Sequence, residues 1–176
     1  MNRVVPVREA MRTDVLTAIK GTNVAKVAKL MAEHGVGSIV VVEGKKPIGI
    51  LTERDLLMKV VSEDLKPSTV RVGKIMSGPL VTIDPDADIV EAAKIMASNK
   101  IRRLPVVKNG RLIGIITSSD ITAISPALSE IVAHPERPTE ERVDHSVCEN
   151  CGEVTTELYE VNGMWVCENC RDTIGE

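Results

Sequence analysis

The stretch GILTERD, Gly49 to Asp55, occurs again as GIITSSD, Gly114 to Asp120. Both copies follow the pattern Gly-Ile-x-Thr-x-x-Asp. When Met11–Leu57 is laid over Met76–Thr122, the two segments align without a gap and share many residues. Self-similarity at a fixed spacing is the sequence signature of a repeated structural unit. The sequence therefore predicts two copies of one unit.

Each copy predicts the element order β-α-β-β-α. A short apolar segment (VLTAI or LVTI) precedes an amphipathic helix, which begins near Val24 in the first copy and near Ile89 in the second. Thr22 or Asn23 could cap the first of these helices, and Asp86 or Asp88 the second. Two strands follow, and the second pair is joined at Asn109-Gly110, which is a strong hairpin signal.

We therefore expect an α/β (α+β) fold with repeat 1 at residues 1–65 and repeat 2 at residues 66–130. A unit of about 60 residues has a marginal core of its own, so the two repeats should pack together. The chain has no Phe, one Trp and one Tyr, which predicts an aliphatic core and argues against a base-stacking platform for nucleic acid.

Composition also indicates where the protein acts. No apolar run approaches the roughly 20 residues of a membrane helix, and charges interrupt the N-terminal stretch, unlike in a secretory signal. From Glu136 onward there are eleven acidic and three basic residues, whereas the first 135 residues carry 19 basic and 14 acidic ones. We expect a soluble cytoplasmic protein with no membrane partner. The acidic end would be repelled by nucleic-acid phosphates.

The Thr-x-x-Asp pattern allows two interpretations that are compatible. It resembles a capping box, in which the Thr hydroxyl and the Asp carboxylate satisfy backbone N–H groups at a helix start. It could also hold a nucleotide, because a helix N-terminus attracts phosphate and an ionised carboxylate can accept both hydroxyls of a ribose. Two copies in a repeat favour the second interpretation more than one copy would.

The two repeats resemble a tandem pair of CBS domains, the cystathionine-β-synthase modules. The resemblance covers roughly Val4 to Ile124 and is most specific in IRRLPVV, Ile101–Val107, and in the two Gly-Ile-x-Thr-x-x-Asp motifs. It implies pseudo-two-fold symmetry and two clefts between the repeats. It also implies an adenine nucleotide or adenosyl ligand of the AMP, ADP, ATP or S-adenosylmethionine type, and a homodimer.

The resemblance also implies site residues. Asp55 and Asp120 would hold ribose, Thr52 and Thr117 would lie near ribose or phosphate, and arginines would reach phosphate. The base would lie against apolar groups near Ile39 and Leu104 and their neighbours. The further candidate nucleotide-binding residues are Val36, Ser38, Arg54, Ile101, Arg102, Arg103, Ser118 and Ser119. Alternatively, the arginines form a solvated face with ion pairs to residues such as Glu53 or Glu91.

The repeats differ in their arginines. Arg54 corresponds to Ser119, and Arg102-Arg103 correspond to Gly37-Ser38. If Arg102 and Arg103 cross toward Asp55, as the resemblance implies, that cleft collects three guanidinium groups. The Asp120 cleft would keep only small polar residues. We therefore expect the Asp55 cleft to prefer ligands with more phosphates.

All four cysteines lie near the C-terminus, as Cys148, Cys151, Cys167 and Cys170. Their spacing, C-x2-C-x15-C-x2-C, is that of a four-thiolate zinc site. We expect a linker at 131–146 and a zinc ribbon at 147–176, with Asn162-Gly163 forming a hairpin. Iron in a rubredoxin-like site, or two disulfides, are the alternatives. His134 and His145 are interpreted as linker residues.

These features predict a regulatory ligand-binding protein, similar to small archaeal CBS proteins with a C-terminal zinc ribbon, in which the ribbon could also bind a protein partner. One alternative is a nucleic-acid-binding or transcription-associated factor, although the ribbon is acidic. Another is a redox module with iron. An enzyme is not expected, because the sequence shows no Ser-His or Cys-His arrangement and no P-loop.

Overall fold

The structure is a computed structural model, and it describes residues 4–132 and 145–174. The chain divides into two compact units, Met1–Ala133 and His134–Glu176. Most of the expected linker at 131–146 lies outside the described residues, as does His134. Among the described residues, no helix combines the length and the apolar character needed to cross a membrane.

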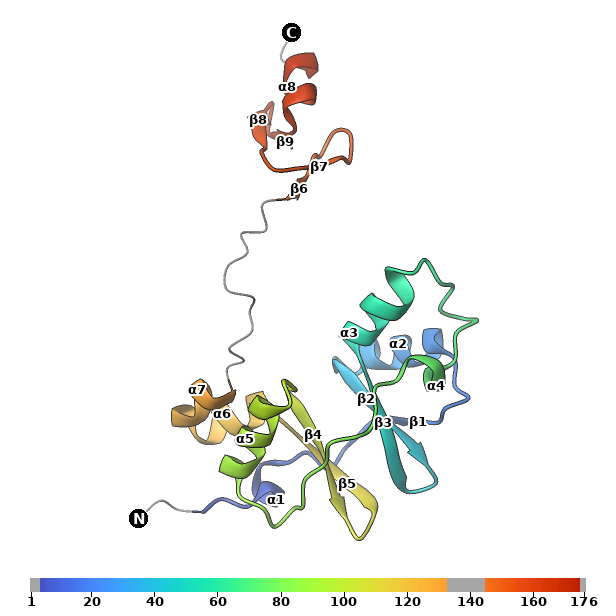
Figure 1. Ribbon diagram of the computed structural model, residues 1–176, viewed down its shortest axis with the longest axis vertical. Coiled ribbons are helices and arrows are strands. Elements are labelled where there is room, and N and C mark those ends of the chain that lie inside the picture. The colour runs from blue at the N-terminus through green and yellow to red at the C-terminus, as the bar shows by residue number, and fades with distance from the viewer. Residues whose placement is uncertain (1–3, 133–144, 175–176) are drawn as a thin grey trace. The chain divides into compact units, whose positions relative to one another are not determined.

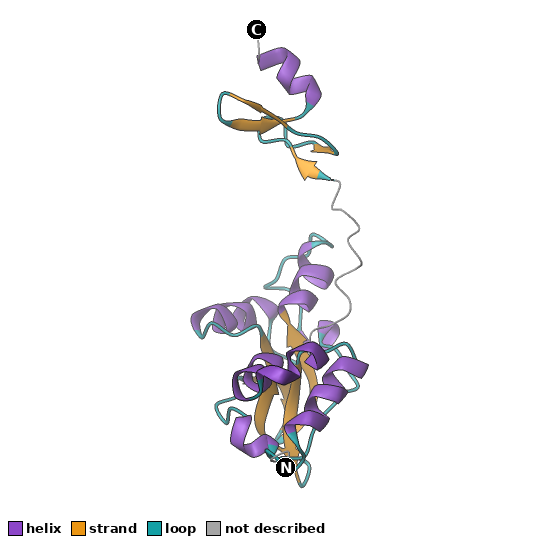
Figure 2. Ribbon diagram, turned by 90° about the vertical axis from the view of Figure 1, so that its left-hand side faces the viewer, coloured by secondary structure: helices purple, strands orange, loops and turns teal. Residues whose placement is uncertain are grey.

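The first unit is a mixed α/β structure in which helices flank the strands (Figure 2). Most of its elements follow the expected order in each repeat, and short helices are added before and after them (Figure 1). In chain order they are α1 (Val7–Ala10), β1 (Thr17–Ala18), α2 (Val24–Glu33), β2 (Ser38–Glu43), β3 (Lys46–Thr52), α3 (Glu53–Leu56), the π-helix η1 (Leu57–Val61), α4 (Val72–Ile75), α5 (Ile89–Ser98), β4 (Arg103–Lys108), β5 (Arg111–Thr117), α6 (Ser118–Ile124), the 3-10 helix η2 (Pro126–Leu128) and α7 (Ser129–Val132).

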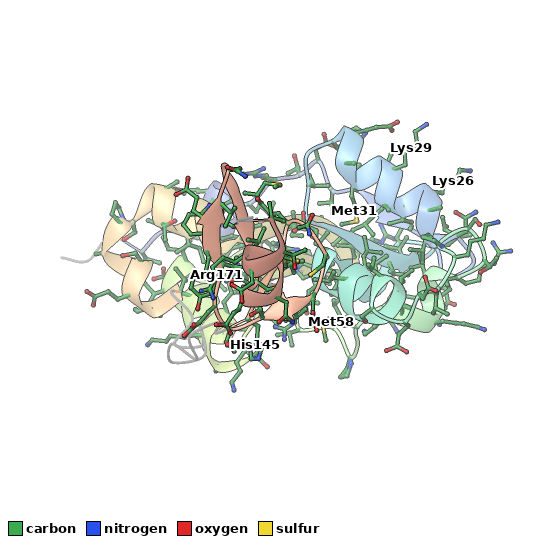
Figure 3. The ribbon with its side chains drawn as sticks, turned by 90° about the horizontal axis from the view of Figure 1, so that it is seen from above. Lys26, Lys29, Met31, Met58, His145 and Arg171 are labelled. Carbon is green, nitrogen blue, oxygen red and sulfur yellow. The ribbon has the colours of Figure 1, made fainter. Side chains whose placement is uncertain are left out.

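The amphipathic helices α2 and α5 begin at polar side chains that cap them. Asn23 caps α2 by accepting a hydrogen bond from the backbone N–H of Lys26, and Asp88 caps α5 by accepting one from Val90. Figure 3 shows Lys26 and Lys29 pointing outward from α2, whereas Met31 is buried. Met96 of α5 is buried as well, whereas Met11 and Met76 are partly buried and pack against the two cores.

The strands form a three-stranded sheet in repeat 1 and a two-stranded sheet in repeat 2. The strand expected at LVTI in repeat 2 is absent, since only a single parallel bridge joins Ile83 to Val106. In repeat 1 the N–H of Val40 donates to the carbonyl of Leu16 and holds β1 against β2. The counterpart of Val40 is Pro105, which has no N–H to donate. The missing ladder bond explains why the second copy keeps only one bridge.

The short helices α1 and α4 exchange places between the repeats. Val7 of α1 is fully buried in the core around α5, β4 and β5, together with Ile89, Leu104 and Ile116. Val72 and Ile75 of α4 lie in the other core, around α2, β2 and β3. Figure 1 shows α1 beside the elements of repeat 2 and α4 beside those of repeat 1. Each core therefore contains residues from both sides of the boundary predicted between residues 65 and 66. The boundary itself remains a prediction from the sequence.

The exchanged segments, which are α1 and α4 with the two residues that follow each of them, also pair with strands of the opposite repeat. The backbone of Arg12 pairs with Ile115 of β5, and that of Ser77 pairs with Ile50 of β3. These contacts need a glycine on the strand. A Cβ at Gly114 would lie 2.9 Å from the carbonyl oxygen of Arg12 and 2.7 Å from the Sδ of Met11. The glycine of each repeated motif therefore makes room for the exchanged segment.

The second unit is small and contains two short antiparallel strand pairs and one helix. Its elements are β6 (Ser146–Val147), β7 (Val154–Thr155), β8 (Tyr159–Val161), β9 (Met164–Val166) and α8 (Glu168–Ile174). The hairpin predicted at Asn162-Gly163 joins β8 to β9, and both residues have positive φ, 55° and 80°. The helix α8 was not predicted. The buried core consists of Val166 with Cys148 and Cys167.

Candidate functional site

The Thr-x-x-Asp motifs form two capping boxes at the starts of α3 and α6. In repeat 1, Thr52 donates to Asp55 Oδ2 from its backbone N–H, at 2.9 Å, and from its hydroxyl, at 2.7 Å. The Asp55 N–H in turn donates to Thr52 Oγ1. Thr117 and Asp120 repeat this arrangement at 2.9 and 2.6 Å. The capping interpretation is therefore confirmed, and the proton of each Thr hydroxyl is donated to the carboxylate.

Asp55 is held by a cation from its own repeat. Its Oδ1 accepts hydrogen bonds from Lys59 Nζ at 2.7 Å and from Ser77 Oγ at 2.8 Å. Asp55 is the one charged residue that is buried among those the structure describes. Burial raises the pKa of this carboxyl, but the bonds from Lys59, Thr52 and Ser77 together outweigh it and lower the pKa below its ordinary value.

Asp120 is held by a cation from the exchanged segment. Arg12 Nε donates to Asp120 Oδ1 at 3.0 Å, and the Arg12 Nη2 lies 3.0 Å from the same oxygen. The expectation that only small polar residues would surround Asp120 is therefore wrong. Arg12 was missed because it lies 108 positions away in the chain. A signal was present, since Arg12 is the repeat counterpart of Ser77, but it becomes useful only once the exchange of segments is known.

One of the predicted arginines does cross between the repeats. Arg103 Nη1 donates to the carbonyl oxygen of Gly37 at 2.6 Å. Burial lowers the pKa of Arg103, while the nearby Glu53 carboxylate raises it, with the net shift downward. Arg54 and Arg102 are exposed. The same carbonyl oxygen of Gly37 accepts a hydrogen bond from the N–H of Glu53, the first residue of α3, so Arg103 reaches the start of α3, as the crossing hypothesis requires for that side chain.

The remaining candidates lie around the same helix starts. Ser38 is paired with Thr52 in the sheet, as Arg103 is with Thr117. Ser118 and Ser119 open α6. Val36 and Ile101 are partly buried, whereas Ile39 and Leu104 are fully buried inside the two cores. Ile39 and Leu104 therefore present little surface to a ligand.

The four cysteines of the second unit converge on one point. All four Sγ atoms lie within 4.8 Å of one another, and those of Cys151 and Cys167 are 3.8 Å apart. A tetrahedral zinc ion with Zn–S bonds of about 2.3 Å places its sulfurs about 3.8 Å apart, so the donor set fits such an ion. The cysteines are not joined by disulfides. This arrangement can hold a metal ion.

The electrostatics of the cluster favour a bound cation. Burial raises the pKa of Cys148, but backbone N–H groups of Cys151, Cys167 and Asn150 outweigh it and lower that pKa to about 6. The Glu153 N–H lowers the pKa of Cys151, yet the adjacent Cys148 and burial raise it to about 12. One thiolate thus opposes the formation of the next, and a metal cation would relieve this repulsion. His145 is exposed and lies outside the cysteine group.

Comparison with known proteins agrees with this geometry. The family model described as "CBS domain" matches residues 7–62 and 72–126. Uncharacterised archaeal proteins align over almost the whole chain. One from Methanopyrus kandleri is 40% identical over 98% of this chain and 93% of its own length. One from Methanocaldococcus jannaschii is 41% identical over 98% of this chain and 95% of its own length.

A solved structure resembles the first unit. It is the CBS domain pair of a protein named MJ0100, in complex with 5′-methylthioadenosine and S-adenosyl-L-methionine. It is 25% identical to this chain and has a TM-score of 0.63, with 68% of this chain and 98% of that one covered. The two matches to the family model coincide with the two repeats, each with its exchanged short helix. The chain therefore belongs to the CBS domain family, with two CBS domains in tandem and a group of four cysteines near its C-terminus.

Proposed function

We propose that this chain is a regulatory protein whose CBS pair binds an adenine nucleotide or adenosyl ligand between the repeats. The observation that carries the proposal is the pair of capping boxes, each of which presents an Asp carboxylate at a helix start beside a cation. A carboxylate can accept a ribose diol, and the adjacent cation and helix N-terminus suit a phosphate. The complex of the similar CBS pair with two adenosyl compounds supports this class of ligand.

The two proposed sites share the Thr and Asp of the motif and differ in the other residues around them. Asp55 and Asp120 would bind ribose, and Thr52 and Thr117 would orient them. Arg103 and its exposed neighbours Arg54 and Arg102 would lie near phosphate, together with Ser118 and Ser119. Val36, Ser38 and Ile101 would contact the base or the sugar. We predicted that the Asp55 cleft prefers ligands with more phosphates because the Asp120 cleft would have no cation. Arg12 supplies a cation at Asp120, so this reason for the preference is weakened.

For the second unit, we propose a structural zinc ion on Cys148, Cys151, Cys167 and Cys170. Four thiolates complete a tetrahedral shell, so the site keeps no position for water and suits structure better than hydrolysis. The S···S distance of 3.8 Å supports a single ion. Iron would fit the same donors, and it would be recognised by visible absorption of the purified protein. The metal-bound unit could then present a stable surface to a protein partner.

Homodimerisation through the CBS pair is supported by an exposed apolar surface. Three large side chains of the π-helix are more than half exposed: Leu57 at 58%, Met58 at 55% and Val61 at 65%. Covering such a surface with a second copy would remove it from water. We expect light scattering to give twice the chain mass of 19.1 kDa, and Met58→Glu to shift the mass toward that of one chain. An unchanged mass in this variant would contradict this interface.

Ligand binding can be tested by thermal unfolding with AMP, ADP, ATP and S-adenosylmethionine in separate titrations. A ligand at 100 times its Kd should stabilise the folded protein by about 2.7 kcal/mol, which raises the unfolding midpoint by roughly 5–10 °C. The shift should disappear when Asp55 and Asp120 are both changed to Asn. GMP serves as the matched control for the base. No shift with any of the adenosyl ligands would contradict the proposed function.

A further inference from the structure

The two motif carboxylates differ in how firmly their acceptor positions are occupied. A carboxylate offers about four lone-pair sites. At Asp55 these are filled by Lys59 Nζ and Ser77 Oγ on Oδ1, and by the N–H and hydroxyl of Thr52 on Oδ2. A ribose diol can bind only by displacing one of these donors. The Thr52 bonds form the helix cap, so the donors to be displaced are Lys59 and Ser77.

Lys59 is costly to displace because its ammonium group donates to three partners. Besides Asp55, it donates to the carbonyl oxygen of Ile75 at 2.8 Å and to Ser77 Oγ at 3.3 Å. Ile75 is the last residue of α4, where carbonyl groups have no partner within the helix. Withdrawal of Lys59 would remove a donor from this carbonyl and leave the buried Asp55 without its counter-charge.

Asp120 is held by a donor that can move away at little cost. The Arg12 side chain is 65% exposed, whereas that of Lys59 is 41% exposed. Arg12 donates to Asp120 Oδ1 alone among the side-chain hydrogen bonds described for it. The Asp120 side chain itself is only 11% exposed, close to the 9% of Asp55, so the two sites differ in the cation and not in the carboxylate. The ribose hydroxyls would take over the hydrogen bonds of Asp120 when the exposed Arg12 side chain moves into water. The guanidinium released in this way remains beside the site, and its planar fork of N–H groups suits a phosphate.

The sequence difference behind this asymmetry lies outside the shared motif. The counterpart of Lys59 in repeat 2 is Ile124, which carries no charge, and the counterpart of Arg12 in repeat 1 is Ser77. Building on the proposed adenosyl ligand, we infer that Lys59 closes the Asp55 site, so each chain binds one nucleotide, at Asp120. Arg12 then moves from the Asp120 carboxylate to the ligand's phosphate. Lys59 thus determines which of the two sites is used.

Calorimetric titration of the full chain with AMP tests this assignment through the number of sites. The wild type should bind one AMP per chain, and Lys59→Ile, which places the repeat 2 residue in repeat 1, should bind two. Lys26→Ile makes the same charge change on the outward face of α2 and should leave the number at one (Figure 3). Two sites of similar affinity in the wild type, or one site in a folded Lys59→Ile variant, would overturn the inference.

Substitutions in the wild-type background give a test that does not depend on the folding of Lys59→Ile. Asp120→Asn should weaken AMP binding by about tenfold or more, and Asp55→Asn should weaken it less. Arg12→Ala should weaken AMP binding but not adenosine binding. The opposite order of the two Asp variants would overturn the inference while leaving the proposed function intact. Absence of binding of AMP, ADP, ATP, S-adenosylmethionine and adenosine in the wild type and in every variant would overturn both.

Discussion

Removal of the metal with a chelator is expected to unfold the four-cysteine unit, residues 145–174, while the CBS pair stays folded. Two of the three buried core residues of this unit are cysteines, Cys148 and Cys167, so little apolar core remains without the ion. Structural zinc contributes on the order of 10–16 kcal/mol to the folding of comparable small modules. The protein's one tryptophan, Trp165, lies on β9 and reports on this unit alone, whereas far-UV circular dichroism is dominated by the CBS pair.

Addition of zinc should restore the Trp165 fluorescence. Cys148→Ser should reproduce the metal-free spectrum even when zinc is present, and Ser146→Ala, two residues away and exposed, should behave as the wild type. If chelated protein kept the Trp165 spectrum and the protease resistance of the metal-bound form, the four thiolates would not depend on a metal for folding.

Gly114→Ala is expected to destabilise the CBS pair by about 1–3 kcal/mol, which is unusual for the gain of one methyl group. The new Cβ would lie 2.9 Å from the Arg12 carbonyl oxygen, and backbone cannot yield as a side chain can. Both backbone hydrogen bonds between Arg12 and Ile115, each 2.9 Å, would be strained. Urea unfolding followed by far-UV circular dichroism would measure the loss.

Substitutions of two other glycines serve as controls for this prediction. At Gly49, the closest atom to a new Cβ would be the flexible Sδ of Met76, at 2.8 Å, and the Ser77 carbonyl oxygen would be 3.1 Å away, so Gly49→Ala should cost less. Gly21 has no atom within 4 Å of its Cβ position, so Gly21→Ala should be nearly neutral. Equal losses in all three variants would show that close packing of the exchanged segments is not the cause.

Features encoded by neighbouring residues could be predicted from the sequence. Thr52 and Asp55 form their capping box within four residues, as do Thr117 and Asp120, so spacing alone was sufficient. The Asn162-Gly163 hairpin has the positive φ values that its residues favour. The cysteine spacing likewise predicted a convergence that the structure contains: Cys148 and Cys151 come from a turn, and Cys167 and Cys170 from the start of α8.

Features that depend on distant parts of the chain could not be predicted in this way. The helices α1 and α4 have four residues each, too few to show a helical period, and burial of Val7 and Val72 in the opposite core holds them in place. The first strand of repeat 2 was predicted from its apolar residues, but the bond that would hold it is prevented by Pro105, which lies on the partner strand.

In the candidate site, too, some residues could be predicted from local sequence and others could not. The carboxylates Asp55 and Asp120 could be identified from their motif, but their cations could not. Lys59 lies one turn after Asp55 in a π-helix, and Arg12 reaches Asp120 only because the N-terminal segment crosses to repeat 2. The differences between the two sites are therefore set by residues outside the repeated motif.

Binding of an adenosyl ligand through a motif carboxylate would be visible in crystal structures of the full chain grown with AMP and, separately, with S-adenosylmethionine. We expect the ribose hydroxyls within hydrogen-bonding distance of Asp120, the phosphate of AMP on Arg12, and Lys59 still bonded to Asp55. Either ligand bound away from both carboxylates, or neither ligand present in crystals grown at saturating concentration, would contradict this mode of binding.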